Sequence, residues 1–225
     1  AVIAPLFNKF TPLENEALKQ RIQALMDKCG FRSKGIFVMD GSRRSGHGNA
    51  YFTGFGSNKR IVFFDTLLES LEPQEIEAVL AHELGHFRLK HIQKRLLSTA
   101  ALSFGALALL GWLAGEPWFY HGLGASQGSP HMALVLFMLA APPFTFFLQP
   151  LMARLSRRHE FEADAYAVSQ SSGNDLVRAL VKMYRENAST LTPDPLYSAF
   201  HDSHPPAAVR ISHISGTLHQ APQRG

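Results

Sequence analysis

The 225-residue chain contains a single cysteine, Cys29, which limits the kinds of site that it can build. One thiol cannot form an internal disulfide framework, and it excludes a zinc site made of cysteines. A lone cysteine also fits a reducing compartment, where we expect Cys29 to be a small, buried apolar residue.

A strong charge of either sign is also missing. Lys and Arg number 22 against 18 Asp and Glu, so the formal net charge is only +4. This excess is too small to indicate a nucleic-acid partner, and we expect none. The apolar residues 1–7 lack the basic start and the cleavage site of a signal peptide. We therefore expect them to be the end of a longer segment.

Formal charge is absent from two long apolar runs. Residues 96–115 form a run of 20, residues 132–152 form a run of 21, and Glu116 is the only formal charge between Arg95 and Arg154. Twenty helical residues span about 30 Å, the thickness of a bilayer core. The runs therefore predict a two-helix membrane hairpin, and the prolines in the second run predict a kink or break there.

Basic residues flank this hairpin on its outer ends only. The loop between the runs has no Lys or Arg, so the positive-inside rule places both outer ends in the cytoplasm. We expect an integral protein of the bacterial inner membrane or the endoplasmic reticulum, with membrane lipid around the hairpin. The flanking residues are Lys90, Lys94, Arg95, Arg154, Arg157 and Arg158.

The first third of the chain mixes one helix with short strands. A helix is predicted from Pro12, with Thr11 as its N-cap, to Gly30. Residues 35–39, 49–53 and 60–64 then predict a small, meandering antiparallel sheet. We expect the third strand, with the residues around position 49, to form an edge to which an extended peptide could pair.

An HExxH motif at positions 82–86 lies in a helix that Pro73 opens. Positions i and i+4 share one face of a helix, so His82 and His86 can bind one Zn²⁺. Glu83 lies about 100° further round the helix, where it can act as a general base on a water molecule. The alternative interpretation is an amphipathic helix with two half-buried histidines, followed by a basic cluster that includes His91.

A second group of carboxylates follows the hairpin. Glu160 and Asp164 share a helix face, whereas Glu162 points elsewhere. A zinc site with two histidines needs a carboxylate from another helix, and its histidines need an acceptor for their other ring N–H. Glu160 as ligand and Asp164 as acceptor meet both needs. The alternative is a solvated charged face beside Arg157 and Arg158.

The predicted fold class is α+β, mostly α: a zincin-like catalytic part with a small antiparallel sheet, plus the two-helix membrane hairpin. Residues 1–95 and 153–225 are expected to form the two halves of the catalytic domain, with the hairpin at 96–152 between them. A helix is also expected from Asp175 to Asn187.

The chain resembles the type-1 CAAX prenyl protease family of membrane zinc endopeptidases. The resemblance implies one Zn²⁺ per chain bound by His82, His86 and Glu160, with Glu83 as the base, and membrane spans upstream of Ala1. The matching stretches are residues 4–13, 49–51, 77–86 and 156–165, and His204-Pro205-Pro206 with Arg210.

The same resemblance assigns further roles in the cleft. It implies that Asn49 and Ala50 hold the substrate backbone, and that His204 and Arg210 line the cleft, where His204 could stabilise the oxyanion. His159 is not expected to be a ligand.

The predicted function is therefore a membrane-integral zinc metalloendopeptidase of the CAAX prenyl protease type. It would cut peptides or proteins, with or without a prenyl group, near their C-terminus. Two alternatives remain: a heat-shock-type quality-control metalloprotease of the membrane, and a non-catalytic membrane scaffold with a structural metal site. An open fourth coordination position favours an enzyme over a scaffold.

Overall fold

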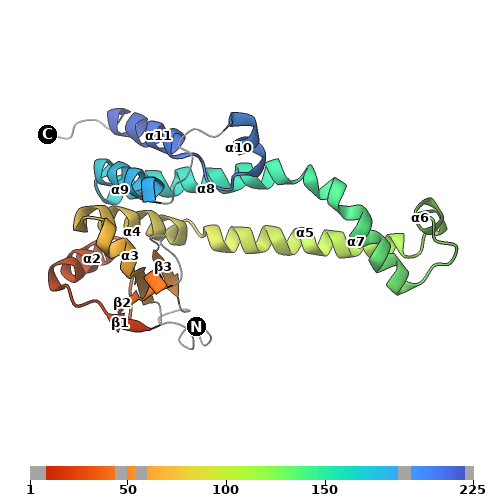
Figure 1. The fold of residues 1–225 in the computed structure, drawn as a ribbon, viewed down its shortest axis with the longest axis horizontal. Helices are drawn as coiled ribbons and strands as arrows, with labels where there is room; N and C mark the ends of the chain where they lie inside the picture. Colours follow the sequence, from red (N-terminus) through yellow and green to blue (C-terminus); the bar gives the residue numbers. More distant parts are fainter. Residues whose placement is uncertain (1–8, 44–49, 54–59, 187–193, 221–225) are drawn as a thin grey trace.

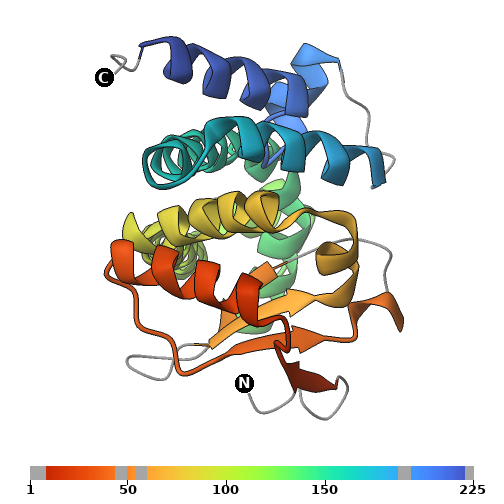
Figure 2. The same ribbon diagram turned by 90° about the vertical axis from the view of Figure 1, so that its left-hand side faces the viewer.

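A small sheet and stacked layers of helices form one end of the molecule, and long apolar helices project from it (Figure 1). The computed structural model describes residues 9–43, 50–53, 60–186 and 194–220. Viewed along the projecting helices, α2 and α4 cover the sheet, α8 and α9 lie on α4, and α10 and α11 form the outermost layer (Figure 2). The fold is mostly helical with one small sheet, as predicted.

The elements of the sheet end are β1 (Phe10–Pro12), α2 (Glu16–Lys28), β2 (Ile36–Met39), the short 3₁₀ helix η1 (Gly41–Arg43), β3 (Ala50–Thr53), β4 (Arg60–Phe64) and α3 (Asp65–Ser70). The remaining helices are α4 (Pro73–Arg88), α5 (His91–Leu113), α6 (Pro117–Gly122), α7 (Pro130–Phe146), α8 (Gln149–Gln170), α9 (Gly173–Glu186), α10 (Pro195–His201) and α11 (Ala207–Gln220).

The sheet is mixed, so the predicted antiparallel meander is wrong. It has four strands in the order β1-β2-β4-β3, and β2 pairs with β4 in parallel. The three residues Ile61, Val62 and Phe63 of β4 are each at most 1% exposed, and burial on both faces favours a central strand over an edge. The edge strand that follows β2 in the chain is therefore β3, and the predicted edge role of residues 60–64 is also wrong.

The first helix begins later than predicted. Phe10–Pro12 is strand β1, which pairs with β2, and Asn15 caps α2 by accepting a hydrogen bond from the Leu18 N–H at 3.0 Å. An asparagine is as good an N-cap as a threonine, so the sequence offered two competing starts. The apolar face of α2 and its end before Gly30 agree with the prediction.

Helix α4 is the central element of the body. Pro73 occupies its first turn, and Glu72 and Glu75 form a reciprocal capping box. Glu75 is 1% exposed, and its carboxylate accepts a hydrogen bond from Lys182 of α9 at 2.7 Å. This half-buried ion pair ties α4 to α9, while the opposite end of α4 packs against α8.

A glycine makes the contact between α4 and α8 close. A Cβ placed on Gly85 would lie 3.0 Å from Ala163 Cα and 3.1 Å from Ala163 O of α8. Both are backbone atoms of a packed helix, which cannot rotate away as a side chain can. The glycine inside the HExxH motif therefore sets how near the two helices approach.

The charge-free runs form an extended arm. Helix α5 leaves the body, and α7 returns beside it at the far end, where Leu113, Phe119, Tyr120 and Ala133 form a second small core (Figure 1). Large apolar side chains are exposed along both helices, among them Leu97, Phe104, Leu139 and Phe144.

By length and composition, α5 could cross a membrane by itself. Helices α7 and α8 have enough apolar length only together, as a broken span or a re-entrant loop, because they meet at a bend of 57°. The break at residues 147–148 lies between the pair Pro142-Pro143 and Pro150, in the run where a proline break was predicted. The second charge-free run, residues 132–152, therefore forms α7 and the start of α8 and is not a single helix. The predicted helix at Asp175–Asn187 corresponds to α9.

Replacing Gly85 with alanine tests the close contact. The new methyl group must push α8 away, and overpacking of this kind costs about 1–3 kcal/mol. Gly216 of α11 is the matched control, since a Cβ there meets nothing within 4 Å. Gly216→Ala should raise the thermal midpoint of the metal-free protein because alanine favours helices. Gly85→Ala should lower it. Equal midpoint shifts in the two variants would refute the packing argument.

Candidate metal centre

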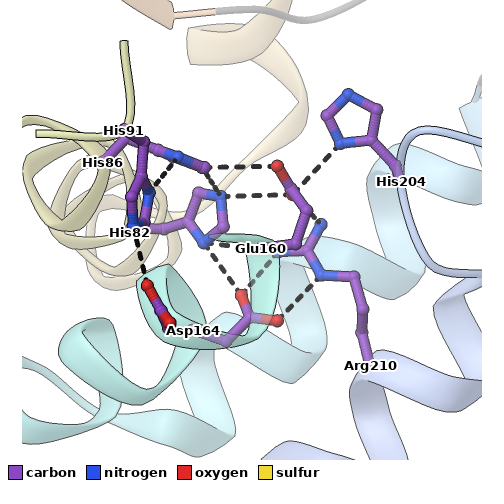
Figure 3. A network of polar contacts seen from close by, with 8 residues as sticks. His82, His86, His91, Glu160, Asp164, His204 and Arg210 are labelled. Atoms are coloured by element: carbon purple, nitrogen blue, oxygen red, sulfur yellow. Dashed lines mark hydrogen bonds and ion pairs between the residues drawn. The ribbon is translucent and has the colours of Figure 1, made fainter. Parts of the chain in front are cut away.

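Three side chains from two helices converge on one point. His82 and His86 of α4 face each other with 3.0 Å between their Nε2 atoms, and Glu160 of α8 completes the group (Figure 3). Its Oε2 lies 3.6 Å from His82 Nε2, and its Oε1 lies 3.4 Å from His86 Nε2. Ligands about 2.0–2.1 Å from a tetrahedral zinc ion lie about 3.3 Å apart, so these separations fit zinc.

The three ligand residues are of the kinds that catalytic zinc sites use. Two imidazoles and one carboxylate are one of the ligand sets of catalytic zinc sites, in which the fourth position is open. Burial lowers the pKa of His86 to about 4, and the neighbouring His82 acts in the same direction. At neutral pH the His86 ring is therefore uncharged and has a lone pair to offer a metal ion.

A buried ion pair holds His82 from behind. Asp164, which is fully buried, has its Oδ1 2.8 Å from His82 Nδ1. Arg210 of α11 donates to the same carboxylate at 2.9 Å from Nε and 2.5 Å from Nη2. This bidentate pair fixes the carboxylate, so the carboxylate can orient the ring. The hydrogen bonds link α4, α8 and α11 (Figure 3).

The structure places Arg210 differently from what a purely substrate-facing residue would need. Its side chain is buried, and its guanidinium is bound to Asp164, with Nη1 3.6 Å from Glu160 Oε2. These contacts favour a role in positioning the ligands. The predicted contact of Arg210 with substrate stays a prediction.

His204 reaches the centre from the segment between α10 and α11. Its Nδ1 lies 3.1 Å from Glu160 Oε2, and this hydrogen bond raises the pKa of the His204 imidazole. Its side chain is 65% exposed, which leaves the Nε2 edge of the ring to face a substrate. The sequence selected this histidine only through the family pattern.

Glu83 lines the same cavity as the three ligand residues. Burial raises the pKa of Glu83 above its usual range; His82 acts against this shift and Glu160 reinforces it. A carboxylate with a raised pKa is a stronger base, which suits a general base at neutral pH.

The cavity has a volume of about 850 Å³ and extends from these residues toward the root of the apolar arm, where α5 and α8 join the body. Lys94, Met152 and Leu155 line that end of it. The site therefore adjoins the point at which the predicted membrane segments leave the body.

The structure describes one of the two residues expected to hold a substrate backbone. Asn49 lies outside the described residues. Ala50 begins β3, the edge strand, and pairs with Phe63 of β4. Its role in binding substrate stays a prediction.

Two further residues contact the centre, although the sequence alone does not assign them to it. The sequence predicts His91 in a basic cluster and Glu162 on another side of its helix. In the structure, His91 Nδ1 lies 2.9 Å from His86 Nδ1, and His91 Nε2 lies 3.1 Å from Glu162 Oε2. Helical spacing gave no signal for these contacts, because His91 follows a break in the helix.

Comparison with known proteins agrees with this geometry. The sequence profile of peptidase family M48 matches residues 12–218. A CAAX prenyl protease 1 homolog of Arabidopsis thaliana is 40% identical over 216 residues, which cover 96% of this chain and 51% of the relative. CAAX prenyl protease 1 of Saccharomyces cerevisiae is 42% identical over 226 residues, covering 93% and 50%.

A solved structure shares the fold. The crystal structure of S. mikatae Ste24p matches with a TM-score of 0.86 and 40% identity, over 95% of this chain and 53% of the other. The chain thus spans about half the length of the curated relatives that it matches. The resemblance inferred from the motifs is confirmed.

Metal analysis of two variants tests the ligand assignment. Glu160→Ala should lose most of its zinc, because only two ligands remain. Glu83→Ala should keep one zinc per chain, since the Glu83 carboxylate is not among the three converging ligands. Elemental analysis after dialysis against a weak chelator provides the measurement. Full zinc occupancy in Glu160→Ala would show that the third ligand lies elsewhere.

Proposed function

The chain belongs to peptidase family M48, and from this premise we propose that its metal centre hydrolyses peptide bonds as a zinc metalloendopeptidase. The observation that carries the proposal is the convergence of His82, His86 and Glu160, with Glu83 on the wall of the same cavity. A purely structural zinc site closes its fourth position with another protein ligand. Within the described residues, the group around these ligand atoms has three members.

The proposed chemistry divides among the residues of the cavity. A bound zinc ion would polarise the scissile carbonyl and make an attacking water more acidic. Glu83 takes the proton of that water, and burial favours this transfer by raising the pKa of the carboxylate. His204 donates from Nε2 to the developing oxyanion while its Nδ1 stays hydrogen-bonded to Glu160.

The proposed substrate is a peptide or protein cut near its C-terminus, as the names of the relatives suggest. We place its prenyl group, where it has one, at the end of the cavity beside the apolar arm, because Met152 and Leu155 line that end. Strand β3 is an edge strand of the sheet and contacts α4. Pairing of the peptide with β3 would add main-chain hydrogen bonds. Asn49 and Ala50 are the residues proposed to hold that backbone.

The arm of α5, α7 and the start of α8 is proposed to cross the membrane. Side chains such as Leu97, Phe104 and Leu139 are exposed on it, and hydrocarbon is the medium in which such a surface is stable. The basic residues at the root of the arm support an orientation in which the catalytic body lies on the cytoplasmic side. In this arrangement the catalytic domain is made of 1–95 and 153–225, with 96–152 as the membrane insertion.

Kinetics of a single variant test the catalytic proposal. Glu83→Ala should retain zinc and fold normally, yet lose peptide hydrolysis by about a hundredfold or more, because it lacks the general base. The assay compares wild type and variant on a farnesylated CaaX peptide and on the same peptide without the lipid. A higher kcat/KM on the farnesylated peptide is expected. Equal activity of Glu83→Ala and wild type would exclude this mechanism.

Labelling in intact cells tests the topology. With Cys29 replaced by serine, Ser126→Cys places a thiol in the exposed segment between α6 and α7, and Ser172→Cys places one between α8 and α9. A membrane-impermeant maleimide added outside should label the first variant and spare the second. Labelling of both from outside, or of Ser172→Cys alone, would contradict the proposed orientation. Lysed cells, in which both thiols should react, are the control.

A further inference from the structure

His91 lies directly behind one of the metal ligands. It is 4% exposed, its Nδ1 is 2.9 Å from His86 Nδ1, and its Nε2 is 3.1 Å from Glu162 Oε2. Arg158 in turn donates to Glu162 Oε1 at 2.8 Å. We propose that His91 and Glu162 are positioning residues, a relay that keeps His86 in the tautomer whose Nε2 is free to bind zinc at this centre. This inference rests on the proposed zinc site.

The direction of every hydrogen bond in the relay follows from the metal. A zinc ion held by this centre would use the Nε2 lone pair of His86, and the proton of the neutral ring would then be on Nδ1. His86 Nδ1–H must therefore donate to His91 Nδ1. Neutral His91 then carries its proton on Nε2, which faces a carboxylate that can only accept. Each donor meets an acceptor, and Glu162 selects this arrangement.

The opposite tautomer of His91 is penalised twice. Its Nδ1–H would face the Nδ1–H of His86, and its Nε2 lone pair would face the carboxylate of Glu162. The ionised carboxylate, paired with Arg158, makes this reversal costly. The histidine is thereby fixed in the form that accepts from His86, and His86 is fixed in the form that leaves Nε2 for the metal ion.

The two ligand histidines are thus held in parallel ways. His82 donates to Asp164, which Arg210 pairs, whereas His86 donates to His91 and through it to Glu162, which Arg158 pairs. These two series of hydrogen bonds differ in how far their carboxylates are exposed to solvent. Asp164 is fully buried, but the Glu162 side chain is 31% exposed.

A break in the helix brings His91 into place. On a continuous helix, a residue five positions after His86 would point about 140° away from it. Helix α4 ends at Arg88, and Lys90 adopts the left-handed conformation with φ 59° and ψ 35° before α5 begins at His91. This joint turns the His91 ring back toward His86 (Figure 3). The first residue of the apolar arm thereby contacts a metal ligand.

A second metal ion is the competing explanation of the same cluster. His91, His159 and Glu162 offer ligand atoms within 4.8 Å of one another. However, the rings of His91 and His159 are stacked, with centroids 4.2 Å apart and planes at 13°. Imidazole lone pairs lie in the ring plane, so those of stacked rings run parallel and do not converge on one ion. The relay also requires a proton on His91 Nε2, the atom nearest Glu162.

Zinc affinity distinguishes these explanations without relying on catalysis. The zinc dissociation constant of the purified protein is measured by competition with a chromogenic chelator, and elemental analysis gives the number of metal ions. His91→Phe keeps the ring shape but accepts no hydrogen bond, so its zinc dissociation constant should rise about 10–100-fold. His91→Gln has an amide oxygen for His86 and an amide N–H for Glu162, and it should recover part of the affinity.

Two further variants act as controls. His159→Phe retains a ring to stack on His91 and lacks a metal ligand; the relay predicts one zinc per chain with unchanged affinity. Glu162→Ala is a change at a partly exposed position, so it tests the relay even where His91→Phe fails to fold, and it should also weaken zinc binding. The thermal midpoint of each metal-free variant shows that the fold is intact. Cobalt substitution adds a visible spectrum that reports the coordination number and geometry at the metal.

The outcomes separate cleanly. Weaker zinc binding in His91→Phe and Glu162→Ala, with rescue by His91→Gln, supports the relay. Wild-type zinc affinity in Glu162→Ala together with wild-type affinity in His91→Phe would overturn it. Two metal ions in wild type and one in His159→Phe would replace it with the second metal site. A wild-type protein that binds no zinc would overturn the proposed function itself.

Discussion

The close approach of α4 to α8 is the constraint on which the rest of the site depends. His82 and His86 are fixed relative to each other by one turn of α4, but Glu160 comes from a helix more than 70 residues later in the chain. The three can share an ion only if the two helix backbones nearly touch. Gly85 permits that contact because it has no Cβ to hold the α4 backbone away from Ala163 of α8. The glycine of the motif therefore acts through packing, while its neighbours act through chemistry.

Burial of charge follows from this packing. The ligand carboxylate, the Asp164–Arg210 pair and His82 are withdrawn from water, where unpaired charges would be costly, and His86 is half-buried. Each of these groups has a partner of opposite charge or a hydrogen bond, and no buried side-chain nitrogen or oxygen in the described part of the chain lacks one. The polar contacts run across α4, α8 and α11, so the network also fixes these helices in register. Metal binding and the packing of the body are thus parts of one arrangement.

The apolar arm is joined to this network and is not an independent appendage. Helix α5 begins at His91, one residue after the left-handed Lys90, and α8 runs from the arm into the body as the helix that carries Glu160 and Asp164. The two helices that connect the arm to the body, α5 and α8, therefore pass within hydrogen-bonding reach of the metal ligands.

The sequence by itself determined the chemistry of the centre and the presence of the arm. An i, i+4 pair of histidines defines a helix face whatever the fold, and a run of 20 residues without charge has the length and composition of a helix that can cross a bilayer. Spacing and the ligand needs of zinc also pointed to Glu160, and family resemblance added His204 and Arg210.

Tertiary structure alone decided how these parts meet. The place of β4 inside a mixed sheet depends on which strands pair, and local patterns of apolar residues do not specify pairing. The inward position of Arg210 on Asp164 depends on where α11 packs. The contact of His91 with His86 requires a joint at Lys90, a lysine in a left-handed conformation that its side chain does nothing to favour. Periodicity places residues on one continuous helix, whereas a contact across a helix break is set by the packing on either side of it.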